Sequence, residues 1–118
     1  MKRVRFAVLV AALAVAIPGC ALGGGQLDTS NPVSTNHVNL PKSYQFDPSV
    51  IKVRPGETVT WTNNDNFTHT VRLLDTGQVL GTMPPGQSLS HVFSKPGTYR
   101  YDCSLHPNDM KGVVIVSG

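Results

Sequence analysis

The sequence predicts an all-β fold, a sandwich or barrel of about seven or eight strands. Across residues 36–118, short runs rich in Val, Thr, Tyr, Phe and Trp alternate with turn residues. No apolar repeat at helical spacing in this region is long enough to predict a helix. Three Pro-Gly pairs separate the runs: Pro55-Gly56, Pro85-Gly86 and Pro96-Gly97. Each pair suits a type II turn, because Pro fixes φ and Gly accepts a positive φ.

The N-terminal part, residues 1–19, is predicted to be a signal peptide of the lipoprotein type. A basic start is followed by an apolar run from Phe6 to Ile17, which is too short to span a bilayer. The segment Ile17-Pro18-Gly19-Cys20 resembles a bacterial lipobox, in which the cysteine becomes the lipidated first residue. An ordinary signal peptide, with Cys20 free or removed, is the alternative.

Residues 20–35 are predicted to be a flexible, Gly-rich linker that begins at the lipid-anchored Cys20. The segment contains three consecutive glycines and few sizeable aliphatic residues, so it cannot bury enough apolar surface to order itself. We therefore expect the folded domain, residues 36–118, to be tethered to a membrane outside the cytoplasm. Its location would be the periplasm or the outer face of the cell membrane.

The charge distribution argues against binding to nucleic acid. The formal net charge is +3, but three of the ten basic side chains lie in the first five residues. The remainder of the chain balances seven basic against seven acidic residues and has no basic cluster, which a nucleic-acid surface requires. We expect a monomer.

The expected strands follow from the alternation of side chains. They cover residues 37–40, 44–46, 50–54, 58–62, 68–74, 87–93, 98–103 and 111–117. In residues 58–62, Val59 and Trp61 face opposite to three threonines and contribute to the core. Residues 113–116 form a continuous aliphatic run, which predicts a strand buried on both faces.

The same alternation places two chemically reactive side chains in the interior. Cys103 shares a strand face with Tyr99 and Tyr101, and His69 shares a face with Val71 and Leu73. Both side chains therefore point into the predicted core.

The stretch from Cys103 to Met110 offers a thiolate, an imidazole and a thioether within eight residues. His69, at the head of an inward-facing strand, supplies a second imidazole. Two imidazoles, a thiolate and a weak axial thioether form the ligand set of a type 1 copper centre. Taken singly, His69 is equally well explained as a core histidine and Met110 as core packing. The combination with Cys103 and His106 favours metal binding.

Four segments carry a resemblance to a known family. They are Tyr44-x-Phe46-x-Pro48, Val53-x-Pro55-Gly56-Glu57-Thr58-Val59-Thr60-Trp61-Thr62-Asn63, His69-Thr70-Val71, and Phe93-x-x-Pro96-Gly97-Thr98-Tyr99-x-Tyr101-x-Cys103-x-x-His106-x-x-x-Met110-x-Gly112. From about residue 36 on, the chain resembles the plastocyanin and amicyanin branch of the cupredoxins. The resemblance implies a Greek-key β-sandwich, one copper ion and the transfer of single electrons. It assigns equatorial ligation to His69, Cys103 and His106 and axial ligation to Met110.

Two features depart from that family. Three residues separate His106 from Met110, a spacing longer than in amicyanin-like loops and shorter than in plastocyanin-like ones. Asn108 or Asp109 is therefore an alternative axial ligand. Thr70 follows the first histidine where plastocyanins usually have Asn, so we expect different hydrogen bonding around the ligands.

The favoured function is an extracytoplasmic electron carrier, not an enzyme, that exchanges electrons with transient redox protein partners. His106 would expose its ring edge within an apolar patch that includes Leu105 and Pro107. Met83 would be a loop residue near the apolar edge of the site. Copper delivery or buffering is the alternative. A copper enzyme is disfavoured because only His37 and His91 remain for a second copper, and zinc is a further chemical possibility.

Overall fold

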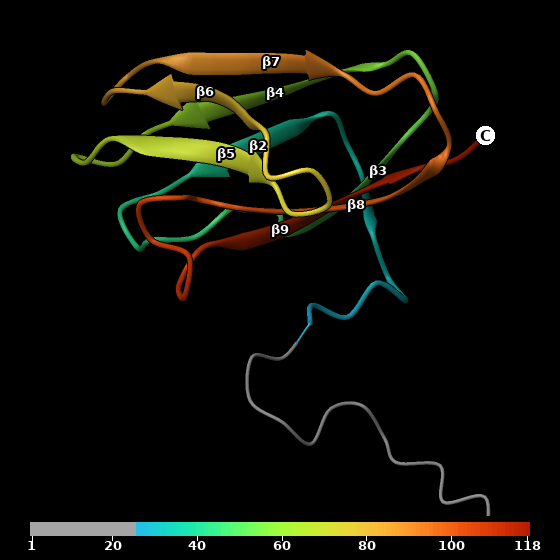
Figure 1. Ribbon diagram of the computed structural model, residues 1–118, viewed down its shortest axis with the longest axis horizontal. Helices are drawn as coiled ribbons and strands as arrows, with labels where there is room; N and C mark the ends of the chain where they lie inside the picture. Colours follow the sequence, from blue (N-terminus) through green and yellow to red (C-terminus); the bar gives the residue numbers. More distant parts are fainter. Residues whose placement is uncertain (1–25) are drawn as a thin grey trace, which may run out of the picture.

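The computed structural model describes residues 26–118, which form nine strands in two sheets (Figure 1). The predicted signal peptide (residues 1–19), Cys20 and the first part of the predicted linker lie outside the described residues. Within residues 26–118, no helix is long and apolar enough to cross a membrane.

The two sheets pack as a Greek-key β-sandwich, which confirms the predicted fold class. Successive strands cross repeatedly from one sheet to the other. The larger sheet has the order β1-β3-β9-β8-β5-β6 and contains β1 (Val33–Ser34), β3 (Val50–Val53), β5 (His69–Leu73), β6 (Val79–Met83), β8 (Gly97–Asp102) and β9 (Lys111–Val116). The smaller sheet has the order β2-β4-β7 and contains β2 (His37–Leu40), β4 (Thr58–Asn63) and β7 (Ser88–Val92).

Several elements differ from the sequence-based expectation. Residues 44–46 form no strand, because Tyr44 has a φ of 52° and only Asp47 bridges back to Asn39. Strands β1 and β6 had no predicted counterpart, and β1 lies in the segment predicted as linker. Gly97 begins β8 instead of completing a turn.

The core is built around the aromatic side chains that the alternation placed inside. Trp61 and Tyr101 are fully buried, and their ring centroids lie 5.5 Å apart in an edge-to-face arrangement. Phe46 packs against Tyr101 in the same manner at 4.8 Å. Such edge-to-face pairs stabilise a core beyond the area that they bury. In β9, Ile115 is only half-buried, so this strand is not covered on both faces throughout its length.

The strand order gathers four loops at one end of the sandwich, on the left in Figure 1. These loops comprise residues 41–49, 64–68, 84–87 and 103–110. The Pro-Gly turn at Gly86 has the expected positive φ, and its amide donates a hydrogen bond to the carbonyl of Asn63. This end of the molecule therefore receives the predicted ligand residues from segments distant in the sequence.

Candidate metal centre

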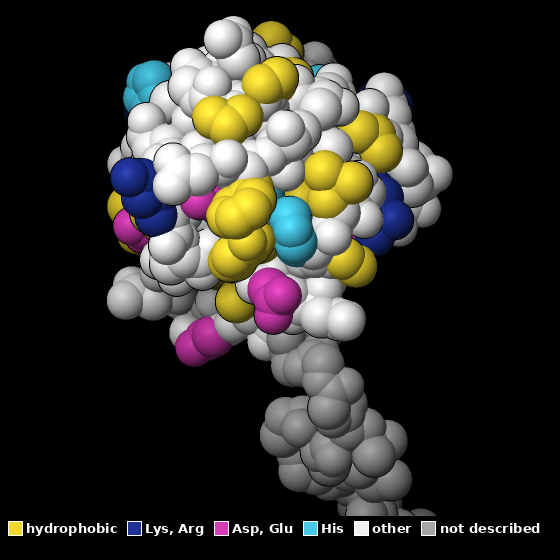
Figure 2. Space-filling model, turned by 90° about the vertical axis from the view of Figure 1, so that its left-hand side faces the viewer, with side chains coloured by type: hydrophobic (Ala, Val, Ile, Leu, Met, Phe, Trp, Pro, Cys, Tyr) yellow, Lys and Arg dark blue, Asp and Glu magenta, His cyan; other side chains and the backbone are white. Residues whose placement is uncertain are grey.

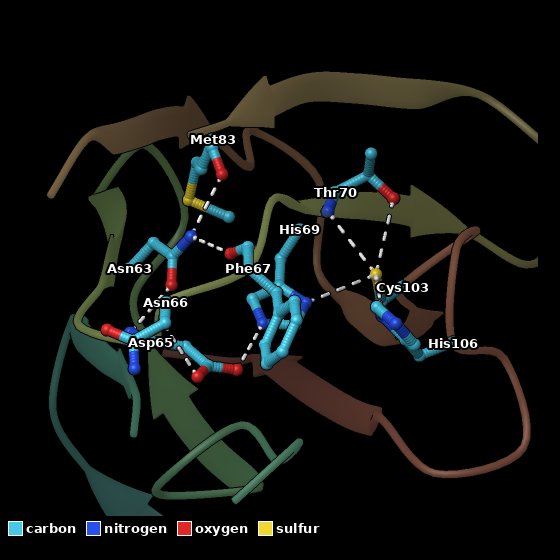
Figure 3. A network of polar contacts seen from close by, with 9 residues as sticks. All are labelled: Asn63, Asp65, Asn66, Phe67, His69, Thr70, Met83, Cys103 and His106. Atoms are coloured by element: carbon cyan, nitrogen blue, oxygen red, sulfur yellow. Dashed lines mark hydrogen bonds and ion pairs between the residues drawn. The ribbon is translucent and has the colours of Figure 1, made fainter. Parts of the chain in front are cut away.

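The structure brings His69, Cys103 and His106 together at this end. His69 begins β5, Cys103 directly follows β8, and the two strands are antiparallel neighbours. Cys103 Sγ lies 3.8 Å from Nδ1 of His69 and 3.8 Å from Nδ1 of His106 (Figure 3). The three atoms all lie within 4.8 Å of one another. His69 and Cys103 are fully buried, whereas His106 is half-buried.

The two sulfur–nitrogen distances fit a single first-row metal ion between the donors. Metal–sulfur and metal–nitrogen bonds of about 2.3 and about 2.05 Å, opened to about 120°, place sulfur and nitrogen about 3.8 Å apart. A tetrahedral angle would give about 3.6 Å. The 3.8 Å distances from Cys103 Sγ to each histidine are therefore compatible with one ion bonded to the sulfur and to the histidine nitrogens. A thiolate with two imidazoles is also a donor set that suits copper.

Backbone hydrogen bonds close residues 103–110 into a compact loop. The amides of His106 and Met110 donate to the carbonyls of Cys103 and His106 at 3.1 Å each, and the amide of Cys103 donates to the carbonyl of Met110 at 3.2 Å. The side chain of Met110 is fully buried. Asn108 and Asp109, the alternative axial candidates, are exposed.

Thr70 connects this loop to β5. Its amide donates to Cys103 Sγ at 3.4 Å, and its hydroxyl lies 3.7 Å from the same sulfur. The hydroxyl oxygen also accepts from the Ser104 amide at 2.8 Å and lies 2.7 Å from the Ser104 hydroxyl. Arg72 and Asp102 form an ion pair at 2.7 Å between β5 and β8.

Asp65, which was not among the predicted site residues, contacts the side of His69 that faces away from Cys103. Its Oδ2 lies 2.7 Å from His69 Nε2, and its side chain is buried (Figure 3). Burial raises the pKa of Asp65, but the hydrogen bonds from His69 and from the Asn66 amide outweigh it, so that the pKa is lowered. The spacing Asp65-x-x-x-His69, a carboxylate shortly before a candidate ligand, was the available signal.

Asn63 fixes the loop that carries Asp65. Its Oδ1 accepts a hydrogen bond from the Asp65 amide, and its Nδ2 donates to the carbonyls of Phe67 and Met83 (Figure 3). Met83 is not the loop residue that the sequence suggested. It ends β6, pairs with His69 across the sheet and is fully buried.

An aromatic and apolar surface surrounds the partly exposed His106. Figure 2 shows this end of the molecule, where a histidine side chain lies among hydrophobic ones. The ring of Tyr44 meets His106 edge to face at 4.8 Å and stacks on Phe67 at 5.5 Å. Phe67 and Leu105, both in loops at this end, are 52% and 54% exposed. Pro107 is exposed as well, as are Pro84 and Pro85.

The two remaining histidines, His37 and His91, lie outside the cluster, in agreement with the prediction from the sequence. His37 is exposed on β2, and His91 packs against Phe93 on β7 with a centroid distance of 4.8 Å. Neither residue belongs to the cluster of His69, Cys103 and His106.

Comparison with known proteins gives the family. Residues 35–117 match the model of the copper binding proteins of the plastocyanin/azurin family. The chain is a cupredoxin of this family. Copper is therefore its cofactor, in agreement with the donor set of the cluster.

Individual cupredoxins agree with this assignment. The chain is 33% identical to amicyanin-alpha from Methylorubrum extorquens, with 98% of this chain and 99% of that protein covered. It is 36% identical to plastocyanin from Scenedesmus fuscus, with 60% and 85% covered. A solved structure, a novel purple cupredoxin from Nitrosopumilus maritimus, superposes with a TM-score of 0.63 at 30% identity. That superposition covers 70% of this chain and all of the other.

Proposed function

We propose that this cupredoxin is a blue-copper electron carrier in which His69, Cys103 and His106 are the equatorial copper ligands. The observation that carries the proposal is the position of the Cys103 sulfur, 3.8 Å from Nδ1 of each histidine. Bound copper would supply a one-electron couple between Cu(II) and Cu(I). The protein holds the thiolate and the imidazoles in place, so that little atomic movement accompanies the transfer.

Met110 is proposed as the axial ligand. It is fully buried, and its backbone is hydrogen-bonded to both Cys103 and His106, so the end of the loop is held against the cluster. Asn108 and Asp109 are exposed to solvent, which makes them poorer candidates. A soft thioether also suits a copper ion better than a carboxylate or an amide does.

We propose that electrons enter and leave through His106. It is half-buried, whereas His69 and Cys103 are fully buried. The exposed side chains of Phe67 and Leu105 provide an apolar surface of the kind that suits brief docking, because electron-transfer encounters are small and weak. The partners would be redox proteins that bind transiently to a monomeric carrier.

The carrier is proposed to work outside the cytoplasm, tethered by a lipid on Cys20. The support is the sequence of residues 1–35, in which an export signal and a lipobox-like motif precede a Gly-rich linker. Mass spectrometry of the exported protein tests the anchor, since a diacylglycerol adduct on Cys20 is expected. An unmodified mature N-terminus would contradict it.

Electron transfer and copper delivery make different demands on the same ligands. A carrier retains its metal in both oxidation states, whereas a delivery protein releases Cu(I) to an acceptor. The burial of His69 and Cys103 favours retention. Catalysis with a second copper is not proposed, because His37 and His91 lie outside the cluster.

Two measurements distinguish electron transfer from copper delivery. The first is cyclic voltammetry of the copper-loaded protein, and the second is incubation of the reduced protein with a Cu(I) chelator of moderate affinity. We expect reversible one-electron reduction and retention of the metal by the protein. Rapid loss of Cu(I) from the reduced protein to the chelator would favour delivery instead.

A further inference from the structure

A buried carboxylate lies on the side of His69 that faces away from Cys103. Nδ1 of His69 faces the sulfur at 3.8 Å, and Nε2 lies 2.7 Å from Asp65 Oδ2. His69 is fully buried and Asp65 is 5% exposed, so water does not separate or screen this contact.

No cationic lysine or arginine offsets this carboxylate among the described residues. Within residues 26–118, the side chain of Arg72 pairs with Asp102, and Asp65 is in contact instead with the imidazole of His69. The other groups that contact Asp65 are neutral. The Asn66 amide donates to Oδ1 of Asp65, and Asn63 Oδ1 accepts from the Asp65 amide. The negative charge of Asp65 therefore acts mainly on His69.

The contact also determines the protonation pattern of the histidine ring. A carboxylate accepts hydrogen bonds, so Nε2 of His69 carries the proton and Nδ1 keeps its lone pair. A metal-binding histidine held in this way has a fixed ring orientation and is a more basic ligand. Asn63 supports the arrangement, because it fixes the Asp65 amide and bonds the carbonyls of Phe67 and Met83.

We propose that Asp65 is a positioning residue that holds His69 as an Nδ1 ligand and lowers the reduction potential of the site. The proposal rests on the proposed function, since it assumes that His69 binds copper. A buried negative charge next to the ligand stabilises Cu(II) more than Cu(I), because the Coulomb interaction is greater with the more highly charged ion. The electron that reduces Cu(II) comes from the redox partner or an electrode, and the Nε2 proton stays on His69.

Asp109 provides a matched comparison. It lies in the ligand loop, carries the same charge and is exposed, and its backbone amide donates a hydrogen bond to the carbonyl of His106. Solvent and salt screen an exposed charge far more than a buried one. Asp65→Asn and Asp109→Asn therefore make the same change in formal charge in different surroundings.

The experiment measures the reduction potential and visible spectrum of the copper-loaded wild type, Asp65→Asn and Asp109→Asn. For Asp65→Asn we expect the ratio of Cu(II) to Cu(I) affinity to fall at least tenfold, which raises the potential by at least about 59 mV. For Asp109→Asn we expect a change of less than twofold. Equal shifts in the two variants would overturn the proposal, as would an unchanged potential in Asp65→Asn.

A purely structural role for Asp65 predicts a different outcome. It would lower the stability of the metal-free protein to urea and leave the potential of the folded, copper-loaded variant at the wild-type value. If Asp65→Asn does not fold, the pair Asp65→Glu and Asp65→Gln repeats the comparison at equal side-chain size. The Glu variant is then expected to have the lower potential, and equal potentials would overturn the proposal.

These outcomes are separable from a failure of the proposed function. If the wild type binds no copper or shows no reversible couple, the electron-carrier proposal fails. If the wild type has a reversible couple and the potential does not respond to the charge at residue 65, only the role of Asp65 fails.

Discussion

Thr70 joins the two segments that supply the proposed ligands. Its hydroxyl accepts a hydrogen bond from the Ser104 amide at 2.8 Å, and its amide donates to Cys103 Sγ at 3.4 Å. The side chain is therefore placed to hold the start of the ligand loop against β5. The hydroxyl group and the backbone amide of Thr70 both take part in this connection.

Replacing Thr70 by the isosteric Val should destabilise the metal-free protein by about 1–3 kcal/mol. The substitution leaves the Ser104 amide without its partner and keeps the shape of the side chain. Urea denaturation measures the effect. Thr70→Ser, which retains the hydroxyl, is expected to recover most of the loss, and a Ser variant as unstable as the Val variant would contradict this role.

The sequence predicted some residues of the site and missed others. The positions of His69 and Cys103 were predictable because strand alternation sets their direction, and the Cys-x-x-His spacing then places His106 in the same turn as Cys103. The direction of the Asp65 side chain was not predictable, because residues 64–68 form a loop without strand alternation, and only its spacing to His69 offered a signal. Tyr44 was quoted only as part of a motif, and its positive φ brings its ring next to His106.

At the level of elements, the pairing of β8 with β9 requires a glycine opposite Tyr101. Gly112 is the cross-strand partner of Tyr101, and a Cβ atom at Gly112 would collide with the Tyr101 ring. The Tyr101 ring is fully buried between the sheets and cannot swing away. This close approach keeps β9, which follows the ligand loop, in register with β8.

Gly112→Ala should therefore destabilise the protein by at least about 1–3 kcal/mol, as overpacking of a well-packed core does. Gly81→Ala is the matched control on β6. There the new methyl group meets the flexible end of Leu89, with Cδ1 at 2.6 Å, which can change rotamer. Thermal unfolding of both variants tests the difference, and a greater loss in Gly81→Ala would be inconsistent with this account.

The strands that the sequence failed to predict have identifiable causes. Strand β6 contains Gly81 and ends immediately before two prolines, so its composition resembled a loop. It forms nonetheless, because Met83 pairs with His69 and is buried in the core. Residues 44–46 alternate like a strand, but the turn conformation at Tyr44 interrupts the extended backbone.

For the whole molecule, the sandwich acts as a scaffold that holds donors from two segments 34 residues apart. Its fold class was predictable from strand alternation and the Pro-Gly turns. The strand order was not, because pairings such as β3 with β9 join segments that are distant in the sequence. The parallel pairing of β1 with β3 was likewise not visible, since Val33 and Ser34 are exposed and show no core pattern.

Copper binding should raise the stability of the whole domain, because the folded state assembles the ligands and the unfolded state does not. At a free copper concentration about a thousand times Kd, the gain is about 4 kcal/mol. Chemical denaturation with and without a copper chelator measures it. His106→Ala should lose most of this gain and His91→Ala should keep it, and the opposite result would place the metal elsewhere.

Copper binding by the Cys103 thiolate is tested most directly by comparing the visible absorption spectra of the copper-loaded wild type and of Cys103→Ala. In the proposed site, the buried Cys103 thiolate would bind copper together with His69 and His106. We predict an intense visible band from the copper–thiolate bond in the wild type and its absence in Cys103→Ala. A wild-type protein that contains copper without this band, or a band that persists in Cys103→Ala, would contradict the account.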